Sequence, residues 1–147
     1  MRPVRGALPS VGDVIRYAYL WSHEHDAGRE EAVKDRPAAV VALIRTAEGA
    51  NEVVVLPITS SAPTESAAGV EIPAPTRARL GLQREQCWIM VSEFNVFGWP
   101  GPDLRATEAG AGSVVYGPLP SVLMARVRQA FAAWRNAKHV RAVRRTE

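Results

Sequence analysis

The chain has 147 residues and a formal net charge of +3, with 47% hydrophobic and 22% charged residues. This length suits one domain with a substantial core, and this composition argues against wholesale disorder. No apolar run approaches the ~20 residues that a bilayer span requires, and the single cysteine, Cys87, cannot form an internal disulfide. We therefore expect a soluble, cytoplasmic protein in which Cys87 packs in the core.

The first half of the chain predicts a lead, a strand, a long loop and a hairpin. Residues 1–11 are expected to be a flexible lead, and the β-branched and aromatic residues 14–21 predict a strand. The polar and charged residues 22–35 predict a long loop of the kind that binds ligands. Residues 38–44 predict a strand buried on both faces, and residues 52–59 predict the strand that returns after a turn.

The second half predicts more short strands and one helix. Prolines at 73 and 75 make residues 69–73 an edge strand, and residues 86–91, 92–97 and 113–117 predict further strands. Pro120 and Ser121 suit the start of a helix. Its apolar stripe comprises Leu123, Val127, Ala130, Phe131 and Trp134.

This series of short strands without βαβ alternation predicts a mainly β fold, a small antiparallel barrel closed by the terminal helix. We expect one barrel domain over residues 12–136 and a basic tail over residues 137–147. Residues 126–147 hold seven basic residues and one acid, whereas residues 1–125 hold 11 basic and 14 acidic residues. Such a basic segment can bind nucleic-acid phosphates, face an acidic partner or be a solvated helix end, and these interpretations stay open.

Two motifs carry the candidate chemistry. Lys34-Asp35-Arg36-Pro37 stands before one predicted buried strand, and Leu56-Pro57-Ile58-Thr59-Ser60 ends the next. We expect the two to meet at one rim of the barrel. A guanidinium beside hydroxyl groups suits a phosphodiester, because the guanidinium fork binds two anionic oxygens at once. The structural alternatives are an ion pair for Arg36 and strand-end capping by the hydroxyls.

The chain resembles the PemK/MazF family of bacterial toxins. The resemblance runs through Gly12-Asp13-Val14-Ile15, residues 35–41 and Pro57-Ile58-Thr59-Ser60, and less closely through residues 90–97 and 115–119. It implies an SH3-like barrel, a homodimer and a cognate antitoxin protein. The implied activity is growth inhibition by metal-independent cleavage of single-stranded RNA, with no cofactor.

The resemblance also implies roles for single residues. Arg36 and Thr59 match the catalytic arginine and threonine, and Ser60 falls beside them. Where some family members have Arg-x-Asp-Gln, this chain has Val91-Ser92-Glu93-Phe94, so the acid is retained as Glu93 and the second arginine is missing. We expect Ser60, Lys34, Glu93, His23 and His25 to bind substrate.

The general base is not identified by the sequence. His23 and His25 are candidates because histidine titrates near neutral pH, and Glu24, Asp26 and Glu93 are alternatives. The spacing His23-x-His25 suggests a metal site but lacks a third ligand at a defined spacing, and we expect no metal.

A second interpretation is a non-catalytic SH3-like module that binds nucleic acid or protein and carries an eroded toxin site. The missing second arginine and the acidic residues of the 22–35 loop favour it. A third assigns binding to the basic tail. The sequence shows neither a glycine-rich phosphate loop in the required strand–helix context nor a Ser-His-Asp arrangement.

Overall fold

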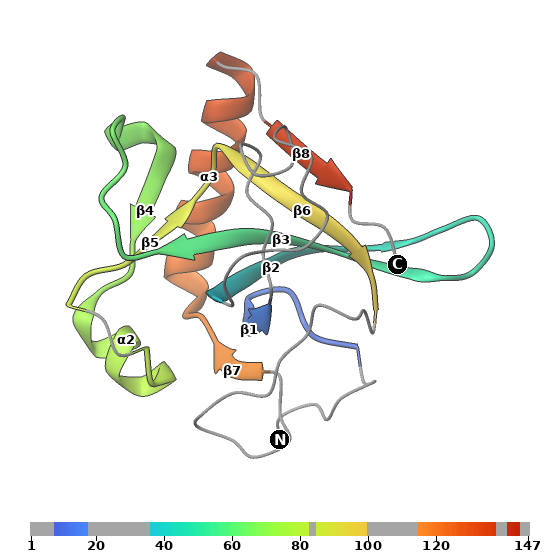
Figure 1. The fold of residues 1–147 in the computed structure, drawn as a ribbon, viewed down its shortest axis with the longest axis horizontal. Helices are drawn as coiled ribbons and strands as arrows, with labels where there is room; N and C mark the ends of the chain where they lie inside the picture. Colours follow the sequence, from blue (N-terminus) through green and yellow to red (C-terminus); the bar gives the residue numbers. More distant parts are fainter. Residues whose placement is uncertain (1–7, 18–35, 83–84, 100–114, 138–140, 145–147) are drawn as a thin grey trace.

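The computed structural model describes residues 8–17, 36–82, 85–99, 115–137 and 141–144 (Figure 1). Eight strands and one long helix make up most of these residues. In chain order, the elements are β1 (Asp13–Tyr17), β2 (Arg36–Arg45), β3 (Asn51–Thr59), the 3-10 helix η1 (Ser66–Ala68), β4 (Gly69–Glu71), α2 (Ala74–Leu80), β5 (Trp88–Met90), β6 (Glu93–Gly98), β7 (Val115–Pro118), α3 (Ser121–Ala137) and β8 (Arg141–Arg144).

Strand β3 organises the sheet. On one side it pairs antiparallel with β2, and on the other side it pairs with β6 through residues 52–55 and with β5 through residues 58–59. Pro57 lies between these last two pairings, where a residue without an N–H group leaves no backbone donor unmatched. The sheet order is β4-β5-β3-β2-β1-β7, and β6 additionally pairs in parallel with β8.

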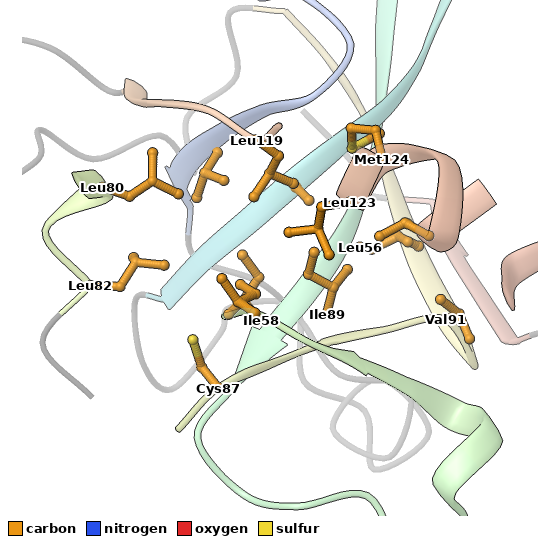
Figure 2. Packing of buried hydrophobic residues seen from close by; sticks show 14 residues of the cluster. Leu56, Ile58, Leu80, Leu82, Cys87, Ile89, Val91, Leu119, Leu123 and Met124 are labelled. Atoms are coloured by element: carbon orange, nitrogen blue, oxygen red, sulfur yellow. The ribbon is translucent and has the colours of Figure 1, made fainter. Parts of the chain in front are cut away.

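One face of the sheet packs against α3, and we call it the helix face. Leu56, Ile58 and Ile89 from the sheet meet Leu123 and Met124 from the helix in a cluster of buried side chains (Figure 2). Because the apolar residues of α3 recur every three or four positions, they form one stripe that faces the sheet. The predicted stripe is confirmed: its residues are buried in this cluster or packed against it. Cys87 is also buried here, as expected.

The opposite face carries a second apolar cluster. Since side chains alternate along a strand, the neighbours of the helix-face residues supply it. It combines Ile15, Tyr17, Ala38, Val40, Val53, Val55, Phe97 and Val115. The rings of Tyr17 and Phe97 stack with their centroids 4.5 Å apart. Both faces of the central strands are therefore apolar, which explains the continuous apolar runs of β2 and β3.

The fold-class prediction is confirmed: the protein is mainly β with a C-terminal helix. Across the part of the chain that the structure describes, the sheet does not close on itself, so its shape is an open, branched sheet rather than a complete barrel. None of the helices in these residues is long and apolar enough to cross a membrane.

The structure differs from the sequence prediction at the end of β2. Residues 38–44 were expected to be buried on both faces, but Leu43 and Ile44 are 38% and 43% exposed. The register between β2 and β3 shifts between Val40 and Ala42, and beyond this irregularity the hairpin projects past the rest of the molecule (Figure 1). The apolar run is therefore longer than the core that covers it.

Two further elements were not predicted. Helix α2 follows β4 directly, with Pro73 as its N-cap and a second proline in its first turn, where no N–H group is needed. Arg79 of α2 donates a 2.7 Å hydrogen bond to the carbonyl oxygen of Pro118, which ties the helix to β7. Strand β8 lies inside the expected tail, and its Val143 is only 2% exposed.

Candidate active site

The described residues of the two sequence motifs, Arg36-Pro37 and residues 56–60, lie at one end of the β2–β3 pair. Strand β2 begins at Arg36, strand β3 ends at Thr59, and the pairing of Ala38 with Pro57 fixes their register. The paired register ends at Ala38 and Pro57, and Arg36 and Thr59 each lie two residues beyond it. The strand ends that carry the guanidinium and the hydroxyl therefore lie at the same end of the β2–β3 pair.

Both side chains belong to the face opposite α3. Ala38 lies on this face in the second cluster, and Arg36 precedes it by two residues; Val55 lies there too, and Thr59 follows it by four. Arg36 and Thr59 are both partly buried, and the Nε atom of Arg36 is shielded from solvent. Partial burial strengthens the attraction of a guanidinium for an anion, because less water screens the charge.

The hydroxyl of Thr59 is oriented by the backbone that follows it. The N–H of Ser61 donates a hydrogen bond of 3.1 Å to the Oγ1 atom of Thr59, which forms a short turn at the strand end. A hydroxyl that accepts one hydrogen bond still has its own hydrogen to donate. Thr59 can therefore donate to a phosphate oxygen while its rotamer is held. Ser60 lies in the bend between these two residues and is exposed.

The cross-strand neighbour of Arg36 in β1 is aromatic. Tyr17 pairs with Arg36 across β1 and β2, and the Tyr17 ring is fully buried in its stack on Phe97. A stacked ring at a fixed backbone position leaves little freedom for the strand end beside it. Arg36 therefore has one defined cross-strand neighbour in Tyr17.

Glu93 opens strand β6 on the same face as this site. Asn95 pairs with Val55 of the second cluster, and Glu93, two residues earlier, points the same way. Both are buried polar residues, with exposures of 7% for Glu93 and 0% for Asn95. Sequence analysis selected Glu93 and missed Asn95. The alternation of side chains along β6 could have identified Asn95: Phe94 packs against the helix-face cluster, so Glu93 and Asn95 point to the other face.

Val91 stands where the resemblance stated above predicts a second arginine. It is fully buried in the helix-face cluster and donates a backbone hydrogen bond of 2.8 Å to the carbonyl oxygen of Ala68. A guanidinium in this apolar cluster would have a high desolvation cost. The chain turns between Val91 and Glu93, so that the former faces the core and the latter faces the opposite side of the sheet.

Three of the predicted substrate-binding residues, Lys34, His23 and His25, lie outside the described residues. The alternatives Glu24 and Asp26 for the general base lie outside them as well. Among the residues that the structure describes, no group of three His, Cys, Asp or Glu side chains is arranged to hold a metal ion.

Two further strands, β5 and β4, continue the pairing from Thr59. Thr59 pairs with Trp88 of β5, and Trp88 pairs in turn with Glu71 of β4. Thr59, Trp88 and Glu71 thus form one row of paired residues across β3, β5 and β4, and Tyr17 pairs with Arg36 across β1 and β2. Trp88 was not selected from the sequence, although its position before the buried Ile89 predicts that it points away from the core.

No known protein-family profile matches this sequence, and no curated protein is significantly similar to it.

Proposed function

We propose that this protein is a metal-independent endoribonuclease that cleaves single-stranded RNA and acts as the growth-inhibiting toxin of a toxin–antitoxin pair. The observation that carries the proposal is the register of β2 and β3, which supports a shared site for Arg36 and Thr59. The similarity of the motifs around these two residues to the PemK/MazF family supplies the reaction. On this proposal the protein works in the cytoplasm, where messenger RNA is available, and forms a homodimer that a cognate antitoxin inhibits.

The chemistry needs no group beyond the substrate and the protein. The 2′-oxygen of one ribose attacks the adjacent phosphorus, and the bond from phosphorus to the 5′-oxygen of the next nucleotide breaks. The products are a 2′,3′-cyclic phosphate and a free 5′-hydroxyl. One proton leaves the 2′-hydroxyl for a base, and one proton is delivered to the leaving 5′-oxygen.

Arg36 and Thr59 have distinct tasks in this reaction. Negative charge grows on the two non-bridging oxygens as phosphorus becomes five-coordinate, and a guanidinium neutralises that charge with two parallel hydrogen bonds. The Thr59 hydroxyl, held by the Ser61 N–H, donates to a phosphate oxygen and fixes the position of the phosphate. Arginine does not lose its proton at neutral pH, so a different group takes the proton from the 2′-hydroxyl.

A second candidate function is a non-catalytic binding module built on the same sheet. The burial of Val91 favours it, because the core position leaves no room for the second arginine that some family members use. On this candidate, Arg36 and Thr59 bind a phosphate without promoting its cleavage. The two functions predict different consequences when the protein is expressed in growing cells.

Growth after induced expression separates the two functions. We expect wild-type protein to arrest growth and Arg36→Ala to restore it at equal protein level. Thr59→Ser is the matched control, because it keeps the hydroxyl at the same strand position and should stay toxic. If cells expressing wild type and Arg36→Ala grow alike, the toxin proposal fails and the binding module is favoured.

A further inference from the structure

We propose that Trp88 is a stacking platform for one nucleobase of single-stranded RNA, next to the phosphate held by Arg36 and Thr59. This inference rests on the proposed function for the identity of the ligand. Its physical basis is separate, because it depends on the paired row Thr59, Trp88 and Glu71 across β3, β5 and β4 rather than on the catalytic chemistry.

The side chain of Trp88 points away from the core. Its neighbour Ile89 is fully buried in the helix-face cluster, and alternation along β5 turns Trp88 and Met90 to the opposite face. Trp88 is only partly buried on that face, whereas Phe97 and Tyr17 of the same face are covered. A large aromatic side chain at this end of the sheet is therefore accessible to a ligand.

The side chains next to Trp88 are closely packed. A Cβ atom added at Gly69 would lie 3.2 Å from the Sδ atom of Met90, 3.2 Å from the Cγ atom of Pro63 and 3.4 Å from the Cβ atom of Trp88. The glycine thus allows β4 to approach β5 with these three side chains gathered around it. These apolar contacts restrict the Trp88 side chain near its Cβ atom. The side chain therefore loses less conformational entropy when a base binds.

The position of Trp88 relative to the site fits one nucleotide. Neighbouring strands lie about 5 Å apart, so Trp88 is about 5 Å from Thr59, with which it pairs. This spacing is comparable to the reach of a nucleotide from its phosphate to its base. A phosphate on Arg36 and Thr59 would therefore leave an adjoining base over Trp88.

The charges of Arg36 and Glu71 favour one orientation of the bound nucleotide. Arg36 attracts the phosphate at one end, and Glu71 at the other end is exposed and carries a carboxylate that accepts a 3.3 Å hydrogen bond from Gln86. A carboxylate repels a second phosphate but tolerates an uncharged base with polar edges. Stacking on Trp88, which lies between the two charges, is consequently favoured for a base and disfavoured for the sugar–phosphate chain.

Binding of an uncleavable strand tests this inference apart from catalysis. The probe is a short, fluorescein-labelled oligonucleotide of mixed sequence with 2′-O-methyl sugars, and fluorescence anisotropy gives the dissociation constant. We expect Trp88→Leu, which keeps an apolar side chain in the strand, to weaken binding about 5- to 150-fold, the range for one base–aromatic stack. Trp88→Phe keeps an aromatic face and should weaken binding by a smaller factor. Thermal unfolding of each variant confirms that it is folded.

A second probe with the same backbone but abasic sites throughout identifies what Trp88 contacts. Wild type and Trp88→Leu should bind this abasic strand with equal affinity, because the stacking partner is gone. If Trp88→Leu binds the first probe as wild type does, or if its defect persists on the abasic strand, the stacking inference is wrong.

Cleavage of unmodified RNA, measured in parallel, keeps this inference separate from the proposed function. Loss of cleavage in Arg36→Ala together with unchanged binding in Trp88→Leu would retain the nuclease and overturn the stacking platform. Base-dependent binding through Trp88 without any cleavage would retain the platform and overturn the nuclease. A folded wild-type protein that binds neither probe would overturn both.

Discussion

Replacing Thr59 by valine separates the chemistry of the candidate site from its architecture. Valine has nearly the same shape as threonine and favours strands equally, so the pairing with Trp88 and the end of β3 should persist. What the substitution removes is the hydroxyl that accepts the 3.1 Å hydrogen bond from the Ser61 N–H and that would donate to the phosphate.

The expected effects on stability and on activity differ strongly in size. The hydrogen bond to Ser61 lies at an exposed bend where water replaces it, so its loss should lower the free energy of unfolding by at most about 1 kcal/mol. A hydroxyl that stabilises charge only in the transition state contributes more, and removing one such donor lowers kcat by about 100- to 1,000-fold. Thr59→Val should therefore be folded and nearly inactive.

The assay compares single-turnover cleavage of a labelled single-stranded RNA with urea unfolding of the same preparations. Thr59→Ser serves as the control, because it retains the hydroxyl and should retain most of the activity. Cleavage by Thr59→Val within a factor of two of wild type would refute the role assigned to this hydroxyl. A loss of activity that Thr59→Ser shares in full would refute it as well.

Three other substitutions test the fold and the site. Leu56→Ala should lower the free energy of unfolding by about 2–5 kcal/mol in urea titrations, because Leu56 is fully buried under α3; a smaller change would show that the cluster is loosely packed. Gly12→Ala should lower it by about 1–3 kcal/mol, since Gly12 has a φ of +97° and a Cβ there would lie 3.4 Å from the Cγ atom of Met124; unchanged stability would contradict the backbone geometry. Arg36→Lys keeps the charge but loses the planar fork, so single-turnover cleavage should slow about 10- to 100-fold, and full activity would show that charge alone suffices.

The main elements of the fold were predictable because their sequence patterns reflect burial. The apolar stripe of α3 recurs with helical spacing and faces the sheet, and the continuous apolar runs of β2 and β3 reflect clusters on both faces. Helix α2 was missed because its prolines were interpreted as marks of an edge strand, although a helix accepts proline in its first turn. The exposure of Leu43 and Ile44 arises because the β2–β3 hairpin projects past the rest of the molecule, which no local pattern records.

The candidate site was predictable only where it coincides with strand ends. Arg36 and Thr59 stand at the start and the end of consecutive strands, so an antiparallel hairpin sets them at the same end of the pair. Trp88 and Asn95 belong to strands that join β3 at different points, and their placement depends on the change of partner near Pro57. No short stretch of sequence indicates such long-range strand pairing.

The most direct test of the account is cleavage of single-stranded RNA in the presence of EDTA by wild type and Arg36→Ala, with analysis of the new ends. The account predicts that wild type cleaves despite EDTA, that the products carry a 2′,3′-cyclic phosphate and a 5′-hydroxyl, and that folded Arg36→Ala does not cleave. Cleavage that EDTA abolishes, or that Arg36→Ala retains in full, would contradict it.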